Sequence, residues 1–99
     1  GNVFRINDDG SIPSDNPYVD KIVINPAIYS YGHRNPQGIF YHPGTDEIWT
    51  NEHGPRGGDE INIIKPLKNY GWPVISYGIN YDSTIFTDLT AKTGMEQPL

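Results

Sequence analysis

Short runs of β-prone residues alternate with glycine and proline along the whole chain. The runs are rich in Val, Ile, Tyr, Phe or Trp and have the length of a strand: Val3–Ile6, Lys21–Ile24, Gly38–Tyr41, Glu47–Thr50, Glu60–Ile64 and Val74–Tyr77. The 11 glycines and 9 prolines interrupt the chain every few residues, so an amphipathic helix of ordinary length cannot persist. The pattern predicts an all-β meander.

The clearest local prediction is a hairpin over residues 38–51. Its two β-prone runs flank the turn sequence His42-Pro43-Gly44-Thr45, in which Gly44 can take a positive φ. A third strand, Asp59–Ile64, follows a glycine-rich loop. Three short antiparallel strands with Trp49 as an aromatic core partner are typical of most of one propeller blade, which has about four strands. A sandwich fits the same pattern, and no internal repeat is visible.

Composition narrows the classes of partner. The net charge is −5 and the 7 basic residues are scattered, which argues against a nucleic-acid partner. No apolar stretch approaches the roughly 20 residues of a membrane span. The chain has no cysteine, which excludes disulfides and thiol chemistry but leaves the cellular compartment open. Because it starts without Met in an apolar alternation and ends without a polar tail, we expect both ends to be truncated.

The loop Tyr31–Gln37 is the first candidate binding segment. Arg34 offers a rigid fork of donors for a carboxylate or another anion. Pro36 disfavours a helix in the residue before it, so the loop is expected to be extended or turned. A structural ion pair between Arg34 and Glu52 or Asp59 is the alternative. The same loop carries two amide side chains that offer donors and acceptors: Asn35 and Gln37.

The loop Glu52–Glu60 is the second candidate. Gly54-Pro55 and Gly57-Gly58 fix an unusual backbone path, which can aim carbonyl oxygens at one point. Carbonyls together with the carboxylates of Asp59 and Glu60 are hard oxygen ligands, suited to Ca²⁺. A solvated turn is the alternative for the acidic pair.

Three further features carry weaker signals. The histidines show no short metal-ligand spacing, so we do not expect a zinc site: His33, His42 and His53. We interpret Asn7-Asp8-Asp9-Gly10 as a turn, because it lacks the alternating ligands of an EF-hand loop. Asn69–Pro73 is either an aromatic platform for a sugar or a buried Trp beside a tight turn. No nucleophilic triad can be assembled.

Three long motifs, Tyr31–Gly38, Glu52–Asn62 and Lys68–Pro73, together resemble the soluble PQQ-dependent aldose sugar dehydrogenases of the glucose/sorbosone dehydrogenase family. Shorter segments near the two ends are similar to the same family: Gly1–Asn7, Gly10–Pro13 and Gly94–Pro98. The resemblance runs in collinear order over essentially the whole chain. It implies that residues 1–99 are a partial domain of this family, somewhat more than one blade of a six-bladed β-propeller.

The resemblance also implies an activity. Members of the family hold pyrroloquinoline quinone (PQQ) at the top of the central channel. They oxidise an aldose at its anomeric carbon to a lactone and pass electrons to an external acceptor. A periplasmic or secreted location follows from the same resemblance.

The resemblance assigns roles to individual residues. Arg34 and Asn35 match positions that bind the carboxylate and carbonyl oxygens of the quinone. His53 matches a cofactor-lining position that is glutamine in the glucose dehydrogenase branch. The carbonyls of Gly54 and Pro55 match ligands of a Ca²⁺ that also touches the cofactor, where it acts as a Lewis acid. Glu60 and Tyr70 match ligands of a second, structural Ca²⁺. Tyr70 would contribute its backbone carbonyl.

The catalytic histidine base of the family lies outside these 99 residues, and none of the three histidines present matches it. We therefore expect the isolated piece to be inactive. Two alternatives remain at this stage. The first is a non-catalytic propeller binding module of the same superfamily, such as the hedgehog-interacting type. The second is a Ca²⁺-dependent lactonase-type propeller, which would need metal-binding side chains clustered on the channel axis.

Overall fold

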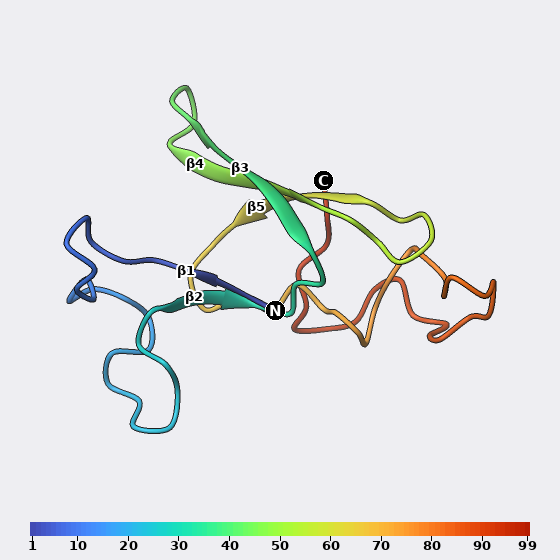
Figure 1. Ribbon diagram of the computed structural model, residues 1–99, viewed down its shortest axis with the longest axis horizontal. Coiled ribbons are helices and arrows are strands. Elements are labelled where there is room, and N and C mark those ends of the chain that lie inside the picture. Colours follow the sequence, from blue (N-terminus) through green and yellow to red (C-terminus); the bar gives the residue numbers. More distant parts are fainter.

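Five short strands form two antiparallel sheets in a computed structural model that describes residues 1–99 (Figure 1). A two-stranded sheet pairs β1 (Asn2–Phe4) with β2 (Ile28–Tyr31). A three-stranded sheet has the order β3 (Pro36–His42), β4 (Glu47–Glu52) and β5 (Glu60–Ile64). The chain contains no helix, so the all-β prediction is confirmed and no helix is present that could cross a membrane.

The predicted hairpin is present. Strands β3 and β4 pair in register from Gly38–Asn51 to His42–Glu47, and β5 extends the sheet as the third strand. The turn differs in one detail, because Asp46 and not Gly44 takes the left-handed conformation, with φ of 57°. Asp residues tolerate this region better than most, and the Asp46 carboxylate also accepts a hydrogen bond from the Tyr41 hydroxyl at 2.7 Å.

Two of the predicted strands are wrong and one strand was missed. Residues 21–24 form turns, with Ile22 and Val23 almost fully exposed, because no neighbouring segment pairs with them. The run Val74–Tyr77 begins with a turn in which two successive amides donate to the Gly71 carbonyl. The missed strand is β2. Its pairing partner, β1, lies far from it in the sequence.

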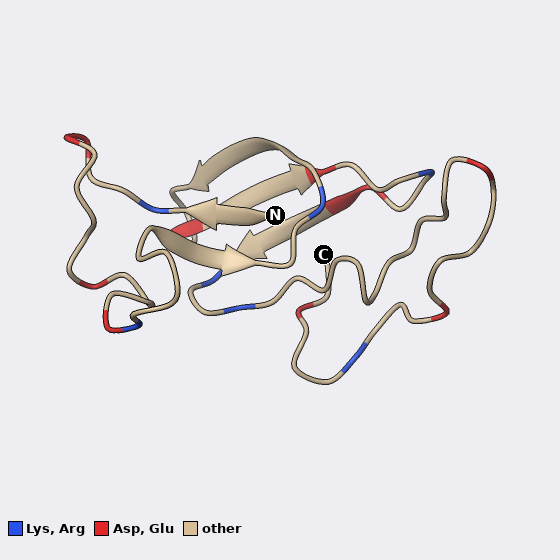
Figure 2. Ribbon diagram, turned by 60° about the horizontal axis from the view of Figure 1, so that its bottom comes forward, with Lys and Arg blue, Asp and Glu red and all other residues tan.

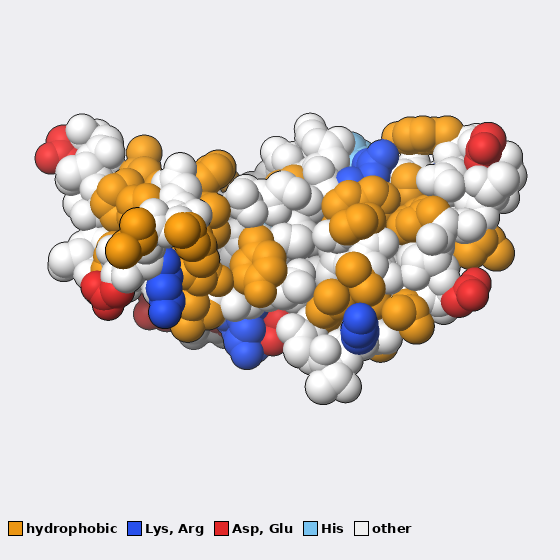
Figure 3. All heavy atoms as spheres, turned by 90° about the horizontal axis from the view of Figure 1, so that it is seen from below, with side chains coloured by type: hydrophobic (Ala, Val, Ile, Leu, Met, Phe, Trp, Pro, Cys, Tyr) orange, Lys and Arg blue, Asp and Glu red, His pale blue; other side chains and the backbone are white.

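The core is small and lies where the two sheets and the C-terminal segment meet. Its buried apolar residues are few: Ala27, Ile64, Tyr70 and Ile75. Many large apolar side chains remain exposed, among them Ile39 and Phe40 of β3, and Figure 3 shows hydrophobic groups spread over one face. Acidic residues gather at loop tips and strand ends, while basic residues are dispersed (Figure 2).

Gly32 joins β2 to the first candidate loop at a point where a side chain cannot fit. Its φ is 78°, and a Cβ atom there would collide with Asn69 Oδ1 and lie 2.7 Å from the Gly71 nitrogen. The close approach of Gly32 to residues 69–72 allows a backbone hydrogen bond, in which the Gly32 carbonyl accepts the Trp72 amide at 2.9 Å.

We expect Gly32→Ala to lower the free energy of unfolding of the full-length protein by more than the roughly 1–2 kcal/mol of a left-handed non-glycine residue. Gly10→Ala is the matched control, since Gly10 has a φ of 84° but open space around it. Urea titration of both variants measures the difference. Equal losses in the two variants would contradict the close packing at Gly32.

Candidate functional site

A buried histidine–glutamate pair anchors the first candidate loop. The His33 side chain is fully buried, and its Nδ1 lies 3.1 Å from Glu52 Oε1 at the end of β4. On the other side of the ring, Nε2 lies 2.9 Å from the hydroxyl of Ser30 in β2. Asn62 Nδ2 of β5 donates to the same Glu52 oxygen at 3.1 Å. The network therefore ties β2, β4 and β5 together beneath the loop.

Glu52 also sets the backbone of that loop. Its Oε2 accepts the backbone amides of Arg34 at 2.7 Å and Asn35 at 3.3 Å. Burial alone raises the pKa of Glu52, but the hydrogen bonds from His33, Arg34 and Asn35 outweigh burial and hold this pKa below its ordinary value. The carboxylate is therefore ionised at neutral pH and fixes the position from which the Arg34 side chain starts.

Tyr70 covers the other face of His33. The two rings stack with centroids 4.6 Å apart. The Tyr70 hydroxyl donates to the Ile63 carbonyl at 2.5 Å and accepts the Lys65 amide at 2.9 Å. Burial is the main cause that raises the pKa of Tyr70 to about 12. The side chain is thus a neutral structural support at physiological pH.

We expect Tyr70→Phe to cost about 1–3 kcal/mol of folding free energy, since it leaves a buried amide and carbonyl without their partner. Tyr77→Phe is the control, because its exposed hydroxyl contacts only the Gln97 side chain. Thermal unfolding of the full-length variants measures both. If Tyr70→Phe unfolds like Tyr77→Phe, the hydroxyl contributes nothing to the support.

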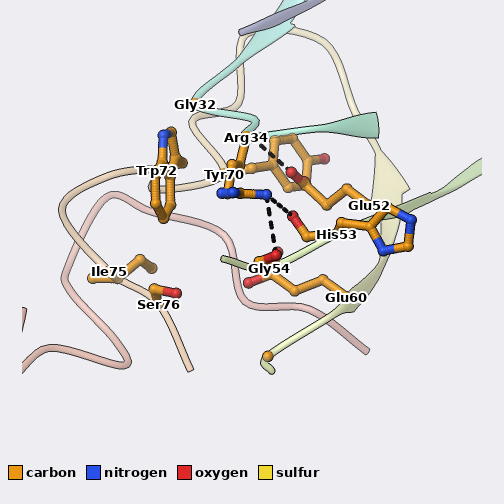
Figure 4. Close-up of a pocket in the computed structure, with 11 residues that line it drawn as sticks. Gly32, Arg34, Glu52, His53, Gly54, Glu60, Tyr70, Trp72, Ile75 and Ser76 are labelled. Atoms are coloured by element: carbon orange, nitrogen blue, oxygen red, sulfur yellow. Dashed lines mark hydrogen bonds between the residues drawn. The ribbon is translucent and has the colours of Figure 1, made fainter. Parts of the chain in front are cut away.

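Arg34 presents its charge without a carboxylate partner. Its Nη1 donates to the carbonyls of His53 at 3.1 Å and Gly54 at 3.0 Å (Figure 4). Its Nη2 donates to the Tyr81 hydroxyl at 3.2 Å. No acidic side chain lies within 4 Å of the guanidinium. The alternative of an ion pair with Glu52 or Asp59 is therefore wrong for this structure.

Asp59 is held away from Arg34 by the second loop itself. Its Oδ1 accepts the Gly54 amide at 2.9 Å, and its Oδ2 lies 3.2 Å from Nδ1 of His53. The hydrogen bond from Gly54 and then the contact with His53 lower the pKa of Asp59. In Figure 4 the His53 carbonyl faces Arg34, while the His53 ring points away from it.

The glycines of the second loop bring carbonyl oxygens close together. A Cβ on Gly54 would collide with the Gly57 carbonyl, and Gly57 and Gly58 both have positive φ, at 73° and 69°. The carbonyls of Pro55 and Tyr70 accept no hydrogen bond from the protein. No group of three or more His, Cys, Asp or Glu side chains is arranged to hold a metal ion.

Glu60 adds the one half-buried carboxylate that faces this region. Burial is the largest cause that raises the pKa of Glu60, the Asn62 amide lowers it, and the nearby charge of Glu52 raises it further. Asn62 is buried, and its Oδ1 has no hydrogen-bond partner. Glu60 and Asn62 therefore lie next to each other on β5, joined by a hydrogen bond of 3.4 Å from Asn62 Nδ2 to Glu60 Oε2.

A pocket at this end of the sheet collects most of the predicted site residues (Figure 4). Arg34, His53, Gly54, Glu60 and Tyr70 all line it, whereas Asn35 and Pro55 do not. The Asn35 side chain instead accepts a hydrogen bond from Gln37 Nε2 at 2.7 Å. The walls are completed by residues to which the sequence motifs gave no role: Gly32, Glu52, Gly58, Trp72, Ile75 and Ser76.

Sequence reasoning missed the supporting role of two side chains, Glu52 and His33. A signal was present, because strand alternation places Glu52 on the same face of β4 as the buried Thr50. A carboxylate on a buried face requires partners. The role of Tyr81 had no comparable signal, since 47 residues separate it from Arg34.

An arginine without an acidic partner lies beside two carbonyl oxygens in a pocket at one end of an antiparallel sheet. The chain is therefore an all-β protein whose pocket offers a positive charge to an anion. The model of the Glucose / Sorbosone dehydrogenase family matches residues 1–99. The chain belongs to this family, whose relatives include quinoprotein sugar dehydrogenases.

Two characterised relatives illustrate the similarity. Aldose sugar dehydrogenase YliI of Escherichia coli K12 is 46% identical over 101 residues, which covers 100% of this chain and 27% of that protein. Quinoprotein glucose dehydrogenase B of Acinetobacter calcoaceticus is 47% identical over 76 residues, covering 77% of this chain and 15% of the relative. The chain thus spans less than a third of the length of these relatives.

Solved structures agree with the sequence comparison. The soluble aldose sugar dehydrogenase from Escherichia coli in its apo-form superposes with a TM-score of 0.94 at 47% identity, covering 99% of this chain and 29% of that chain. The PQQ-bound aldose sugar dehydrogenase from Streptomyces coelicolor gives 0.71 at 31% identity, covering 99% and 24%. The chain therefore has the fold of one part of a β-propeller-type sugar dehydrogenase.

Proposed function

We propose that this chain is part of a PQQ-dependent aldose sugar dehydrogenase and that the residues lining its pocket form one wall of the sites for the quinone and Ca²⁺. The enzyme would oxidise aldoses at the anomeric carbon to lactones, with an external electron acceptor. We further propose that residues 1–99 are a partial domain of a six-bladed propeller. The observation that carries the proposal is that Arg34 has no acidic partner in a pocket lined mainly by the three family motifs Tyr31–Gly38, Glu52–Asn62 and Lys68–Pro73.

The residues present fit an anionic cofactor. A guanidinium whose neighbours are two neutral carbonyls and a phenol keeps its full charge for a carboxylate. Charge-assisted hydrogen bonds from Arg to a carboxylate are among the strongest in proteins. We propose Arg34, Asn35 and His53 as quinone-binding residues. Asn35 lies one residue beyond the pocket lining, on a backbone that Glu52 fixes.

The residues also fit hard cations. The Gly54 carbonyl lines the pocket and accepts Arg34 Nη1 at 3.0 Å, which leaves its second lone pair for a cation, and the Pro55 carbonyl has no competing donor from the protein. We propose these two oxygens as ligands of the Ca²⁺ beside the quinone. Glu60 and the backbone carbonyl of Tyr70 are proposed for a second Ca²⁺, since both residues line the same pocket. Oxygen donors of this kind suit Ca²⁺.

In the reaction, this chain's residues bind and orient and do not transfer the proton. A bound quinone would supply hydride-acceptor chemistry, and a bound cation would supply Lewis-acid polarisation of a carbonyl. Arg34 would hold the anionic edge of the cofactor, and the buried Glu52–His33 pair would keep Arg34 in place. His33 and His53 match positions of the family that do not carry the base, so neither is assigned as the base. We propose that the base lies outside these residues.

The alternative of a non-catalytic propeller module is separated from the enzyme by turnover. We expect the full-length protein to bind PQQ in the presence of Ca²⁺ and to reduce a dye when an aldose is added. Removal of Ca²⁺ by a chelator should abolish the dye reduction, and added Ca²⁺ should restore it. Quinone binding without sugar oxidation would favour the non-catalytic module. No quinone binding would refute the proposal. A periplasmic or secreted location is proposed from the same family membership.

A further inference from the structure

The guanidinium of Arg34 lies against two aromatic rings from the C-terminal third of the chain. Its central carbon is 5.4 Å from the ring centroid of Trp72 and 5.8 Å from that of Tyr81. At these distances a cation is attracted to the ring. Tyr81 contributes twice, because its hydroxyl also accepts a hydrogen bond from Arg34 Nη2 at 3.2 Å. Both aromatic partners are neutral and orient the guanidinium without cancelling its charge.

Tyr81 is 74% exposed, yet it belongs to a closed turn that fixes its backbone. The Asn80 amide donates to the Thr84 carbonyl at 2.9 Å, and the Ser83 amide donates to the Asn80 carbonyl at 2.9 Å. Inside the turn, Asp82 Oδ1 accepts the Thr84 amide at 3.0 Å. The turn therefore fixes the position of the Tyr81 backbone, while the exposed Tyr81 ring contributes little to the core.

The same turn is joined to the second loop of the site. Arg56 and Ile79 exchange two backbone hydrogen bonds, at 2.9 Å and 3.2 Å. The Arg56 guanidinium also donates to the Ser83 hydroxyl. Arg56 directly follows Gly54-Pro55, whose carbonyls we assigned to the cation. Residues 79–84 are therefore linked to both halves of the site, through Tyr81 to Arg34 and through Arg56 to the carbonyl loop.

We propose that Tyr81 is a positioning residue that, together with Trp72, orients Arg34 toward the carboxylate of the quinone. The inference rests on the proposed function and adds to it a residue outside the three family motifs. Its physical basis is preorganisation, since an arginine already held in its binding geometry loses less side-chain entropy when the anion arrives. The ring and the hydroxyl make separable contributions.

Two variants of the full-length protein test those contributions. Tyr81→Phe keeps the ring and removes the hydroxyl, so we expect the dissociation constant for PQQ to rise about threefold. Tyr81→Leu keeps apolar bulk but removes both interactions, so we expect a rise of about tenfold. Tyr41→Phe is the matched control, because its exposed hydroxyl contacts Asp46 on the far hairpin. The constants are measured by quenching of tryptophan fluorescence at fixed Ca²⁺.

A second measurement needs no quinone. Phenylglyoxal modifies accessible arginines, and peptide mass spectrometry reports the rate at Arg34. We expect Arg34 to lose protection in Tyr81→Leu and to keep it in Tyr41→Phe. If Tyr81→Leu binds PQQ as tightly as the wild type and leaves Arg34 protected, Tyr81 has no positioning role. If the wild type fails to bind PQQ while Arg34 is deprotected in Tyr81→Leu, the proposed function fails and the positioning contact stands.

Discussion

Replacing Arg34 by Met is expected to weaken PQQ binding to the full-length protein by at least about a hundredfold. Hydrogen bonds to charged groups contribute about 1.5–3 kcal/mol each, and about 2.7 kcal/mol is a hundredfold in affinity. Met keeps the unbranched apolar stem of Arg and removes the guanidinium with its charge and donors. Isothermal titration at fixed Ca²⁺ measures the change directly.

Arg5→Met is the matched control for that experiment. Arg5 is also an arginine in contact with a tyrosine ring, but it pairs with Asp15 at 2.8 Å on the opposite side of the molecule from the pocket. We expect it to leave quinone affinity unchanged. If Arg34→Met binds PQQ as tightly as Arg5→Met, the guanidinium of Arg34 does not bind the anion.

The second large effect concerns stability. Glu52→Gln is expected to reduce the free energy of unfolding by about 3 kcal/mol or more, because it replaces a buried ionised acceptor, and hydrogen bonds to charged groups contribute about 1.5–3 kcal/mol each. A glutamine at this position must direct its NH₂ group toward either the His33 and Asn62 donors or the Arg34 and Asn35 amides. Either choice sets donor against donor.

Glu47→Gln provides the comparison within the same strand. Glu47 lies at the other end of β4 and forms no ion pair. We expect this variant to change the stability by less than about 0.5 kcal/mol, as surface substitutions usually do. The loss in free energy of unfolding, measured by denaturant titration of the full-length variants, should therefore be severalfold larger for Glu52→Gln than for Glu47→Gln. Equal, small effects would show that the buried Glu52–His33 pair does not support the site.

Much of the fold could be predicted from the sequence, because its clearest elements depend on local signals. The β3–β4 hairpin and β5 follow from runs of β-prone residues around turn sequences. The strand β2 could not be found that way, since its pairing with β1 joins segments that are far apart. The apolar run Ile22–Ile24 looks like a strand by composition and lies in turns, because no edge is available to pair with it.

The candidate site divides in a similar way. Arg34, Gly54 and Glu60, which the family motifs singled out, line one pocket, while their ligands stay predictions. The contacts that hold Arg34 could not be read from the motifs, because they depend on how the C-terminal segment folds back. Tyr81 reaches Arg34 only because residues 79–84 dock on Arg56. The deep position of Glu52 likewise depends on the sheet that surrounds it.

A crystal structure of the full-length protein with PQQ and Ca²⁺ tests the central claim most directly. We expect the quinone to lie against Arg34, Gly54 and Trp72, with a carboxylate of the cofactor within hydrogen-bond distance of the Arg34 guanidinium. Ca²⁺ should be coordinated by the carbonyls of Gly54 and Pro55. A quinone bound elsewhere, with Arg34 still in contact only with protein groups, would contradict the account.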